Sequence, residues 1–200
     1  MAQKDKAIDT IDNLIANNPG LKKSTGDLKN HFPAPVLPAV PTEQRPHILV
    51  VDDDDRAFLY PLREQHRLAK YADTFTLHTL HLTRQSDVLP EITRKIQTYD
   101  HLSALFLDRG QDVGLPTSKI IQGLRKHEAS RYLPIAVITK SMVQDLKDTD
   151  QLLSHGAQRV IFNKRANATF LYELYTSLEQ LQEAIQQKKW LDLWETINTT

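Results

Sequence analysis

The sequence predicts a doubly wound α/β fold, in which helices cover both faces of a five-stranded parallel sheet. Short apolar runs alternate with helical patterns along most of the chain, which is typical of parallel strands that are buried on both faces. The expected strands are 47–51, 74–80, 103–107, 134–138 and 159–162. Right-handed crossovers are expected to connect them.

Apolar residues at helical spacing predict helices between these strands. Their ranges are 56–70, 86–97, 117–127 and 142–155, and a further helix begins near residue 167. Apolar positions three or four apart mark the second and third of them, at Val88, Leu89, Ile92 and Ile96, then at Ile120, Ile121 and Leu124. Pro61 is tolerated in the first turns of the first helix, and Gly156 is a typical stop after the fourth.

The segment before the first strand predicts a separate short helix and a linker. Residues 4–18 carry isoleucines and a leucine at helical spacing, and an Asn-Asn-Pro-Gly sequence ends that pattern. Five prolines in 33–46 favour a stiff, extended linker rather than a packed element. We therefore expect an N-terminal amphipathic helix (1–20), a proline-rich linker (21–46), a main domain (47–180) and a C-terminal helical extension (181–200).

The C-terminal stretch is longer than a five-stranded domain needs. Its leucines and one isoleucine follow a 3–4–3–4 spacing at Leu171, Leu174, Leu178, Leu181 and Ile185. A single helix over 168–198 would be roughly 45 Å long. Its first half is expected to pack on the sheet, while its second half projects or folds back. Trp190 and Trp194 need a place to be buried, which favours a partner protein or a homodimer formed through this helix.

Composition excludes several classes of protein. The 200 residues contain 25 basic and 25 acidic side chains, so the formal net charge is zero. This balance gives no support for a nucleic-acid-binding protein. The absence of cysteine excludes disulfides, thiolate metal sites and thiol nucleophiles. No apolar run approaches the ~18 residues of a transmembrane helix, and no signal peptide is recognised. We expect a cytoplasmic protein without a membrane partner.

Polar residues follow four of the five expected strands. Asp52 and Asp53 follow the first, Asp108 the third, Thr139 the fourth and Lys164 the fifth. Because the carboxyl ends of parallel strands meet at one edge of a sheet, these side chains should share one pocket. Three carboxylates so close need a cation, and oxygen ligands without His or Cys favour Mg²⁺.

The same residue types suit phosphoryl transfer. That reaction needs positioning and charge neutralisation more than covalent chemistry, and an aspartate can itself be the nucleophile. Lys164 would pair with one phosphoryl oxygen, and the Thr139 hydroxyl would donate a hydrogen bond to another.

Four segments of the chain occur in a characteristic order and spacing: HILVVDDDD, ALFLDRG, LPIAVITKS and GAQRVIFNK. Because of these segments, residues 47–180 resemble a bacterial response-regulator receiver domain. The resemblance implies the flavodoxin-like fold, with strand order 2-1-3-4-5. It also implies that Asp108 is the phosphoacceptor. It implies that Asp53 binds the metal directly and that Asp52 does so mainly through water. Asp108 and the carbonyl of Gly110 are the other implied metal ligands. Thr139 and Lys164 would contact the phosphoryl group.

The sequence departs from the pattern of that family at several positions. Asp112 stands where a proline is usual, and Lys140 stands where the residue after the threonine is usually small. Arg165 replaces the proline that usually follows the lysine. The usual aromatic switch position falls on Val160 or Ile161. We therefore expect the residues that carry out phosphorylation to be intact. The signal relay through an aromatic switch residue, which is usual in that family, is not expected here.

Three functions remain open at this stage. The leading one is a stand-alone phosphorylation-dependent switch, not a turnover enzyme, which takes its phosphoryl group from a histidine kinase or a phosphotransfer protein and acts on a downstream protein. The second is a phosphorylation-independent pseudo-receiver that only binds. The third is an aspartate-nucleophile phosphatase, with Asp52-Asp53-Asp54 as an Asp-x-Asp motif. That last family also needs an acidic pair after its lysine, and only scattered acidic residues follow Lys164.

Overall fold

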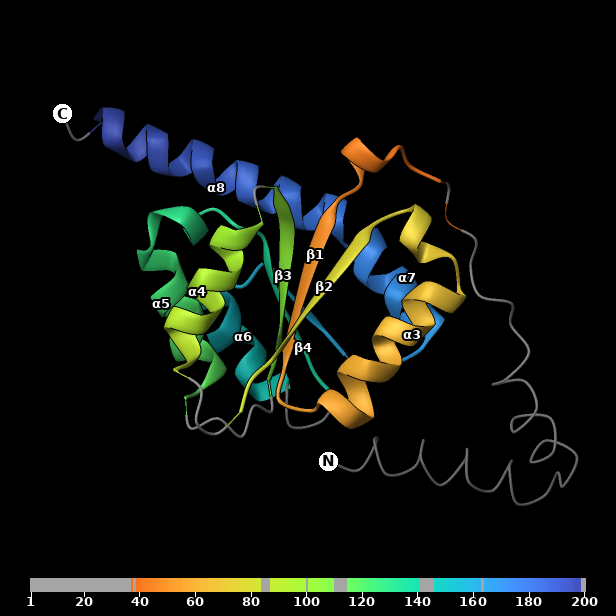
Figure 1. The fold of residues 1–200 in the computed structure, drawn as a ribbon. Coiled ribbons are helices and arrows are strands. Elements are labelled where there is room, and N and C mark those ends of the chain that lie inside the picture. The colour runs from red at the N-terminus through yellow and green to blue at the C-terminus, as the bar shows by residue number, and fades with distance from the viewer. Residues whose placement is uncertain are drawn as a thin grey trace, which may run out of the picture. The chain divides into compact units, whose positions relative to one another are not determined.

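Five parallel strands form one sheet in the order β2-β1-β3-β4-β5 (Figure 1), which confirms the predicted fold class. The strands are β1 (His47–Asp52), β2 (Thr76–His81), β3 (Leu102–Asp108), β4 (Ile135–Ile138) and β5 (Arg159–Ile161). The computed structural model describes residues 37, 39–83, 87–99, 101–109, 115–140, 146–162 and 164–198. The helix expected at 4–18 lies outside these residues.

Helices cover both faces of the sheet (Figure 1). The α-helices are α3 (Tyr60–Leu68), α4 (Val88–Thr98), α5 (Thr117–Lys126), α6 (Leu146–Ser154), α7 (Ala168–Thr176) and α8 (Leu178–Asn198). A π-helical turn, η2 (Asp55–Leu59), leads into α3, and short 3₁₀ turns are η1 (Thr42–Gln44), η3 (Tyr71–Asp73) and η4 (Glu128–Ser130). Apolar side chains of α3 and α7 pack on one face, and those of α4, α5 and α6 pack on the other.

The alternation of side chains along β1 explains why the sheet is buried on both faces. Ile48 and Val50 point into the core beneath α3 and α7, whereas Leu49 and Val51 point into the core beneath α4 and α5. All four are fully buried. A continuous apolar run, rather than an alternating one, is therefore what this strand requires.

The C-terminal stretch is two helices, so the expectation of one helix over 168–198 is wrong. Ser177 separates α7 from α8, and its hydroxyl donates to the carbonyl of Leu174 at 2.8 Å. Thr176 donates in the same way to the carbonyl of Tyr172 at 2.9 Å. Such hydroxyl bonds to the preceding turn bend helices. After this break, α8 crosses the amino-terminal end of the sheet (Figure 1).

The predicted leucine seam is explained by packing within the domain. Its five members are buried, at Leu171, Leu174, Leu178, Leu181 and Ile185. The first four belong to the core beneath α3 and α7, so the seam continues across the break at Ser177. A heptad-like spacing here does not indicate a coiled coil with another chain.

The described part of the proline-rich stretch is anchored to the domain. Val40 donates its backbone N–H to the carbonyl of Asp73 at 2.8 Å, and the Arg45 guanidinium bonds the carbonyl of Val40 at 2.9 Å. Leu37 packs against the core beneath α3 and α7. The expectation of an unpacked linker is therefore wrong for these residues, and 35–200 form one compact unit.

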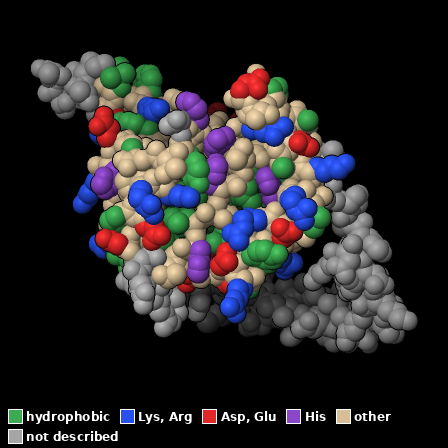
Figure 2. All heavy atoms as spheres, viewed as in Figure 1, with side chains coloured by type: hydrophobic (Ala, Val, Ile, Leu, Met, Phe, Trp, Pro, Cys, Tyr) green, Lys and Arg blue, Asp and Glu red, His purple; other side chains and the backbone are tan. Residues whose placement is uncertain are grey.

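The visible surface of the described residues carries Lys, Arg, Asp and Glu side chains of both signs, interspersed over the helices (Figure 2). Among the described residues, no helix combines the length and the apolar character that crossing a membrane requires.

A histidine pair lies where β1 and β2 meet, close to the end of α4. His78 Nε2 is 3.3 Å from His47 Nδ1, and the ring of His78 stacks on that of Tyr99 with 3.7 Å between the ring centres. Burial, followed by the neighbouring His47 and Lys95, lowers the pKa of His78 from 6.5 to about 4. The folded protein therefore disfavours the protonated form of this imidazole.

We expect the free energy of unfolding of the His78→Gln variant to fall less at acid pH than that of the wild type. Because the pKa of His78 is lower in the folded state, the unfolded chain binds more protons between pH 4 and 6.5, and stability falls as the pH falls through that range. Allowing for partial exposure, the acid-induced loss should be smaller in the variant by about 1–2 kcal/mol. Urea unfolding at pH 7 and pH 4.5 measures it. The exposed His101→Gln control should behave like wild type, and equal losses in all three proteins contradict the prediction.

Candidate functional site

The acidic run after β1 is built into the start of the next helical segment. The buried Asp52 carboxylate accepts the backbone N–H of Asp54 at 2.9 Å. Asp54 in turn caps η2 by accepting the backbone N–H of Ala57 at 2.8 Å. The Asp53 carbonyl lies 3.1 Å from Nε2 of His81 at the end of β2. This run is therefore an ordered turn, in which hydrogen bonds fix the directions of the Asp52 and Asp54 carboxylates.

The end of β3 is held from two sides, which fixes the position of Asp108. Asp108 pairs with Ile138 in the register of β3 and β4, and the N–H of Arg109 donates to the Ile138 carbonyl at 3.0 Å. The hydroxyl of Thr117, the first residue of α5, donates to the carbonyl of Asp108 at 3.1 Å. The Asp108 side chain is buried beside the end of β1.

Lys164 joins the two buried carboxylates. Its ammonium lies 2.5 Å from Oδ2 of Asp52 and 2.6 Å from Oδ1 of Asp108, and its side chain is 2% exposed. The Nζ atom also lies 4.5 Å from the centre of the Phe58 ring, a cation–π contact. The backbone N–H of Lys164 donates to the carbonyl of Thr139 at 2.9 Å. Residues that are 112 positions apart in sequence thus share one polar cluster.

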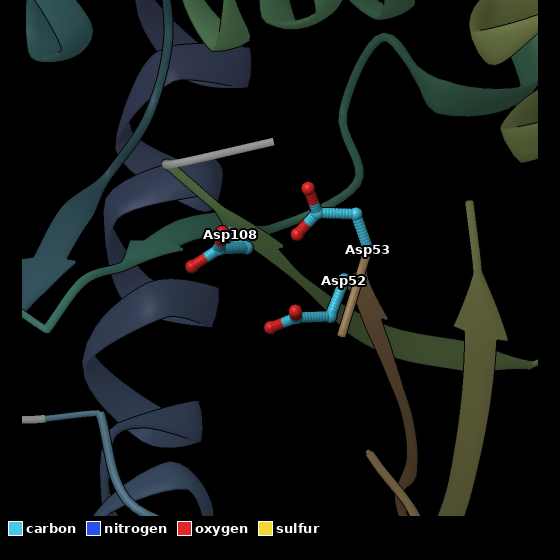
Figure 3. Close-up of side chains that lie close together, drawn as sticks. All are labelled: Asp52, Asp53 and Asp108. Carbon is cyan, nitrogen blue, oxygen red and sulfur yellow. The ribbon is translucent and has the colours of Figure 1, made fainter. Parts of the chain in front are cut away.

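Among the described residues, this cluster gathers three carboxylates around the ammonium of Lys164. Asp52, Asp53 and Asp108 each offer a carboxylate oxygen, and these oxygens lie within 4.8 Å of one another (Figure 3). Burial, and then the charge of Asp108, raise the pKa of Asp52 from 3.8 to about 6, while Lys164 opposes the shift. A divalent cation with oxygen ligands would offset the remaining negative charge, so this donor set fits Mg²⁺.

The structure brings together four of the residues predicted to act at one site: Asp52, Asp53, Asp108 and Lys164. Thr139 is buried at the end of β4, directly after the residue that pairs with Asp108. Gly110, the expected carbonyl ligand, lies outside the described residues, as does Asp112. Lys140 is 64% exposed, and its ammonium lies 3.8 Å from the Asp54 carboxylate.

Two contributors to the site were missed by the sequence interpretation. Phe58 lies beneath the ammonium of Lys164 and meets Phe170 of α7 edge to face, with 5.8 Å between ring centres. Asp54 acts as the cap of η2 rather than as one more solvated acid. Its signal is its position, two residues before the expected helix. The sequence carries no comparable signal for the contact of Phe58 with Lys164.

Comparison of the sequence with protein-family models and with curated proteins gave no match. Solved structures do match in fold. A response regulator from Hahella chejuensis is 16% identical, with a TM-score of 0.51, over 68% of this chain and 97% of that one. The chain has the receiver-domain fold.

Two further receiver domains show the same range of similarity. A response-regulator receiver domain from Clostridium thermocellum is 18% identical over 73% of this chain and 98% of that one, with a TM-score of 0.46. The receiver domain of a sensor histidine kinase from Pseudomonas aeruginosa is 17% identical over 71% and 98%, with a TM-score of 0.47. That protein was crystallised with a magnesium ion coordinated in its active-site cleft.

Proposed function

We propose that this protein is a phosphorylation-dependent signalling switch whose Asp108 carboxylate accepts a phosphoryl group. The observation that carries the proposal is the buried bridge of Lys164 between Asp52 and Asp108, beside Asp53 and at the carboxyl edge of a parallel sheet. A surface acidic cluster would not need a buried lysine from another strand. Ligand sites of open α/β sheets lie at this edge.

The residues divide the chemistry among them. Asp52, Asp53 and Asp108 would hold Mg²⁺, which when bound supplies charge neutralisation for the phosphoryl oxygens. A carboxylate oxygen of Asp108 attacks the phosphorus of the donor, and an O–P bond forms as the N–P bond of a phosphohistidine breaks. The imidazole leaves and takes up a proton. Lys164, already 2.6 Å from Asp108, moves its ammonium onto a phosphoryl oxygen, and Thr139 donates its hydroxyl to another.

The response to phosphorylation follows from the same contacts. The phosphoryl group replaces a charge of −1 by roughly −2, which draws Lys164 and Thr139 toward Asp108. The N–H of Lys164 bonds the Thr139 carbonyl, so the ends of β4 and β5 move together. Lys164 also precedes α7, which makes the face of α6, β5 and α7 the surface that changes. Val160 and Ile161 offer no aromatic ring for the relay.

The partners that fit this function are proteins. A histidine kinase or a phosphotransfer protein would supply the phosphoryl group, and a downstream protein would recognise the altered face. A second copy of the chain, bound through the C-terminal helix, is a further partner. The protein itself would be a phosphoacceptor with no turnover of a separate substrate.

The pseudo-receiver remains the second candidate, because of one observation at the mouth of the pocket. The Lys140 ammonium lies 3.8 Å from Asp54, where the family usually has a small residue. A cation there could occupy the approach that a phosphodonor needs. In that case the fold and the Mg²⁺ site persist while Asp108 does not react.

We expect acetyl phosphate with Mg²⁺ to add one phosphoryl group to the wild-type protein, as read from the intact mass. The Asp108→Asn variant should gain none. It should still fold, because it leaves Lys164 paired with the one remaining buried carboxylate, that of Asp52. The Asp55→Asn variant, at the partly exposed first residue of η2, is the matched control and should be labelled like wild type.

The phosphorylation assay, read together with a calorimetric titration with Mg²⁺, separates the two candidates. Specific binding of Mg²⁺ without phosphorylation of the wild type supports the pseudo-receiver and contradicts the switch. Labelling of Asp108→Asn at the wild-type level contradicts Asp108 as the acceptor.

A further inference from the structure

The outward face of α8 near its C-terminal end is apolar. Four large side chains, Trp190, Leu191, Leu193 and Trp194, are 61%, 55%, 59% and 54% exposed. Figure 2 shows hydrophobic side chains gathered at this end of the helix. We call these four residues the α8 patch. Exposed apolar residues that are contiguous, rather than scattered singly, mark interaction surfaces.

The part of the domain that the structure describes does not cover the α8 patch, because the opposite side of α8 makes the contact with it. Leu178, Leu181 and Ile185 of α8 are buried in the domain. Farther along the same side, Asp192 accepts a hydrogen bond from the Tyr132 hydroxyl at 2.9 Å, and the Lys189 ammonium lies 5.3 Å from the Tyr132 ring. These contacts fix the rotation of α8 and turn the α8 patch away from the described core of the domain.

The α8 patch is one continuous surface. Trp190 and Trp194 are four residues apart, one turn of helix, so they lie side by side, with Leu193 on one flank and Leu191 on the other. The two indole rings stack nearly parallel, at 10°, with 5.6 Å between their centres. A flat aromatic pair between two leucines is preorganised for burial, since its side chains lose little freedom on binding.

The sequence of the α8 patch reads the same in both directions: Trp190-Leu191-Asp192-Leu193-Trp194. If two such helices lie antiparallel about a two-fold axis at the level of Asp192, each Trp190 meets Trp194 of the partner subunit. A two-fold interface uses the same patch on both subunits and must be self-complementary. The four patch residues carry no charge, so the pairing brings no like charges together.

The area of the α8 patch fits a weak dimer. At the exposures above, two tryptophans and two leucines amount to roughly 400–500 Å² of accessible surface. Two patches together would bury roughly 800–1,000 Å², which is in the range of weak, transient interfaces. We propose that the α8 patch is the docking site for a second copy of this chain, in antiparallel pairing, with a dissociation constant on the order of micromolar. This proposal does not depend on phosphorylation.

Sedimentation of the full-length chain over a range of concentrations tests the pairing. Wild type should pass from 22.9 kDa to twice that mass as its concentration rises. Trp190→Glu should raise the dissociation constant at least about thirtyfold, as expected for a central tryptophan. Leu68→Glu is the matched control, since Leu68 is 64% exposed on α3, and it should dimerise like wild type. A wild type that stays monomeric at ~100-fold the expected dissociation constant overturns the proposal.

The orientation of the pair has its own test, because the chain has no native cysteine. A spin label on Glu183→Cys, on the exposed side of α8, reports the distance between two copies. An antiparallel pair centred on Asp192 separates the labelled positions by about 27 Å along the helix axis. A parallel pair brings them within about 10 Å, which would overturn the antiparallel arrangement.

A lipid surface as the occupant of the α8 patch is tested with the same proteins. Co-sedimentation of monomeric wild type, but not of Trp190→Glu, with vesicles of anionic phospholipid would overturn the dimer in favour of a lipid surface. The Asp108→Asn variant separates this proposal from the signalling one. This variant should not be phosphorylated by acetyl phosphate, and its dimer should keep the wild-type dissociation constant. Either proposal can therefore fail without contradicting the other.

Discussion

Replacement of Lys164 by methionine is expected to lower the free energy of unfolding by ~3 kcal/mol when no divalent cation is present. The variant leaves the carboxylates of Asp52 and Asp108 buried side by side without the ammonium that now lies 2.5 and 2.6 Å from them. Removing one partner of a buried ion pair costs more than the pair itself contributes. Urea unfolding in the presence of a chelator measures the effect.

Two further measurements show whether the loss comes from uncompensated charge. Millimolar Mg²⁺ should recover much of the lost stability of Lys164→Met, because the cation would take over the neutralising role. Adding Asp108→Asn to Lys164→Met should also recover stability, since it removes one of the two carboxylates. The prediction is wrong if the double variant is as unstable as the sum of the two single variants. Phosphorylation of Lys164→Met by acetyl phosphate should fall at least ~100-fold.

Replacement of Arg125 by methionine is expected to lower the free energy of unfolding by about 2–4 kcal/mol. The guanidinium of Arg125 donates to the carbonyl of Gly156 at 2.7 Å, to that of Leu133 at 2.7 Å and to that of Ser130 at 3.0 Å. It thereby ties the end of α5 to the segments before β4 and before β5. Burial lowers the pKa of Arg125 to about 10, so it stays charged at neutral pH.

The structure offers a matched control for Arg125. Arg67 is 69% exposed and pairs only on the surface with Glu64, at 2.9 Å, so Arg67→Met should cost less than ~0.5 kcal/mol. Gly156 has a φ of 106°, and a Cβ there would lie 3.0 Å from Nε of Arg125. Gly156→Ala should therefore also destabilise the fold. A loss below ~1 kcal/mol for Arg125→Met, by thermal or urea unfolding, contradicts a central role for this side chain.

The strands and the polar cluster could be predicted because their signals are strong and local. An apolar run such as Ile48–Val51 has few alternatives in a chain of alternating strands and helices. Once the sheet is parallel, its geometry alone places Asp52, Asp108 and Lys164 at one edge. Prediction of the site therefore followed from the prediction of the fold, without any knowledge of distances.

Other features depend on contacts that the sequence does not encode locally. Arg125 binds carbonyl groups, which every residue possesses, so no pattern of side chains indicates its partners. The break at Ser177 interrupts a seam of buried residues that stays in register, so the apolar spacing gives no warning of it. Only the adjacent hydroxyls of Thr176 and Ser177 offered a signal. The contacts of Leu37 and Val40 likewise depend on residues much later in the chain, namely the core beneath α3 and α7 and the carbonyl of Asp73.

The position of α8 across the amino-terminal end of the sheet has a consequence for the order of events in the proposed function. The carboxylate pocket lies at the other end, and six residues of β1 separate the two ends by roughly 20 Å. In a pair joined through α8, both pockets would face away from the shared surface. A phosphodonor would then meet an open pocket on monomer and dimer alike, and assembly would neither wait for the phosphoryl group nor block its arrival.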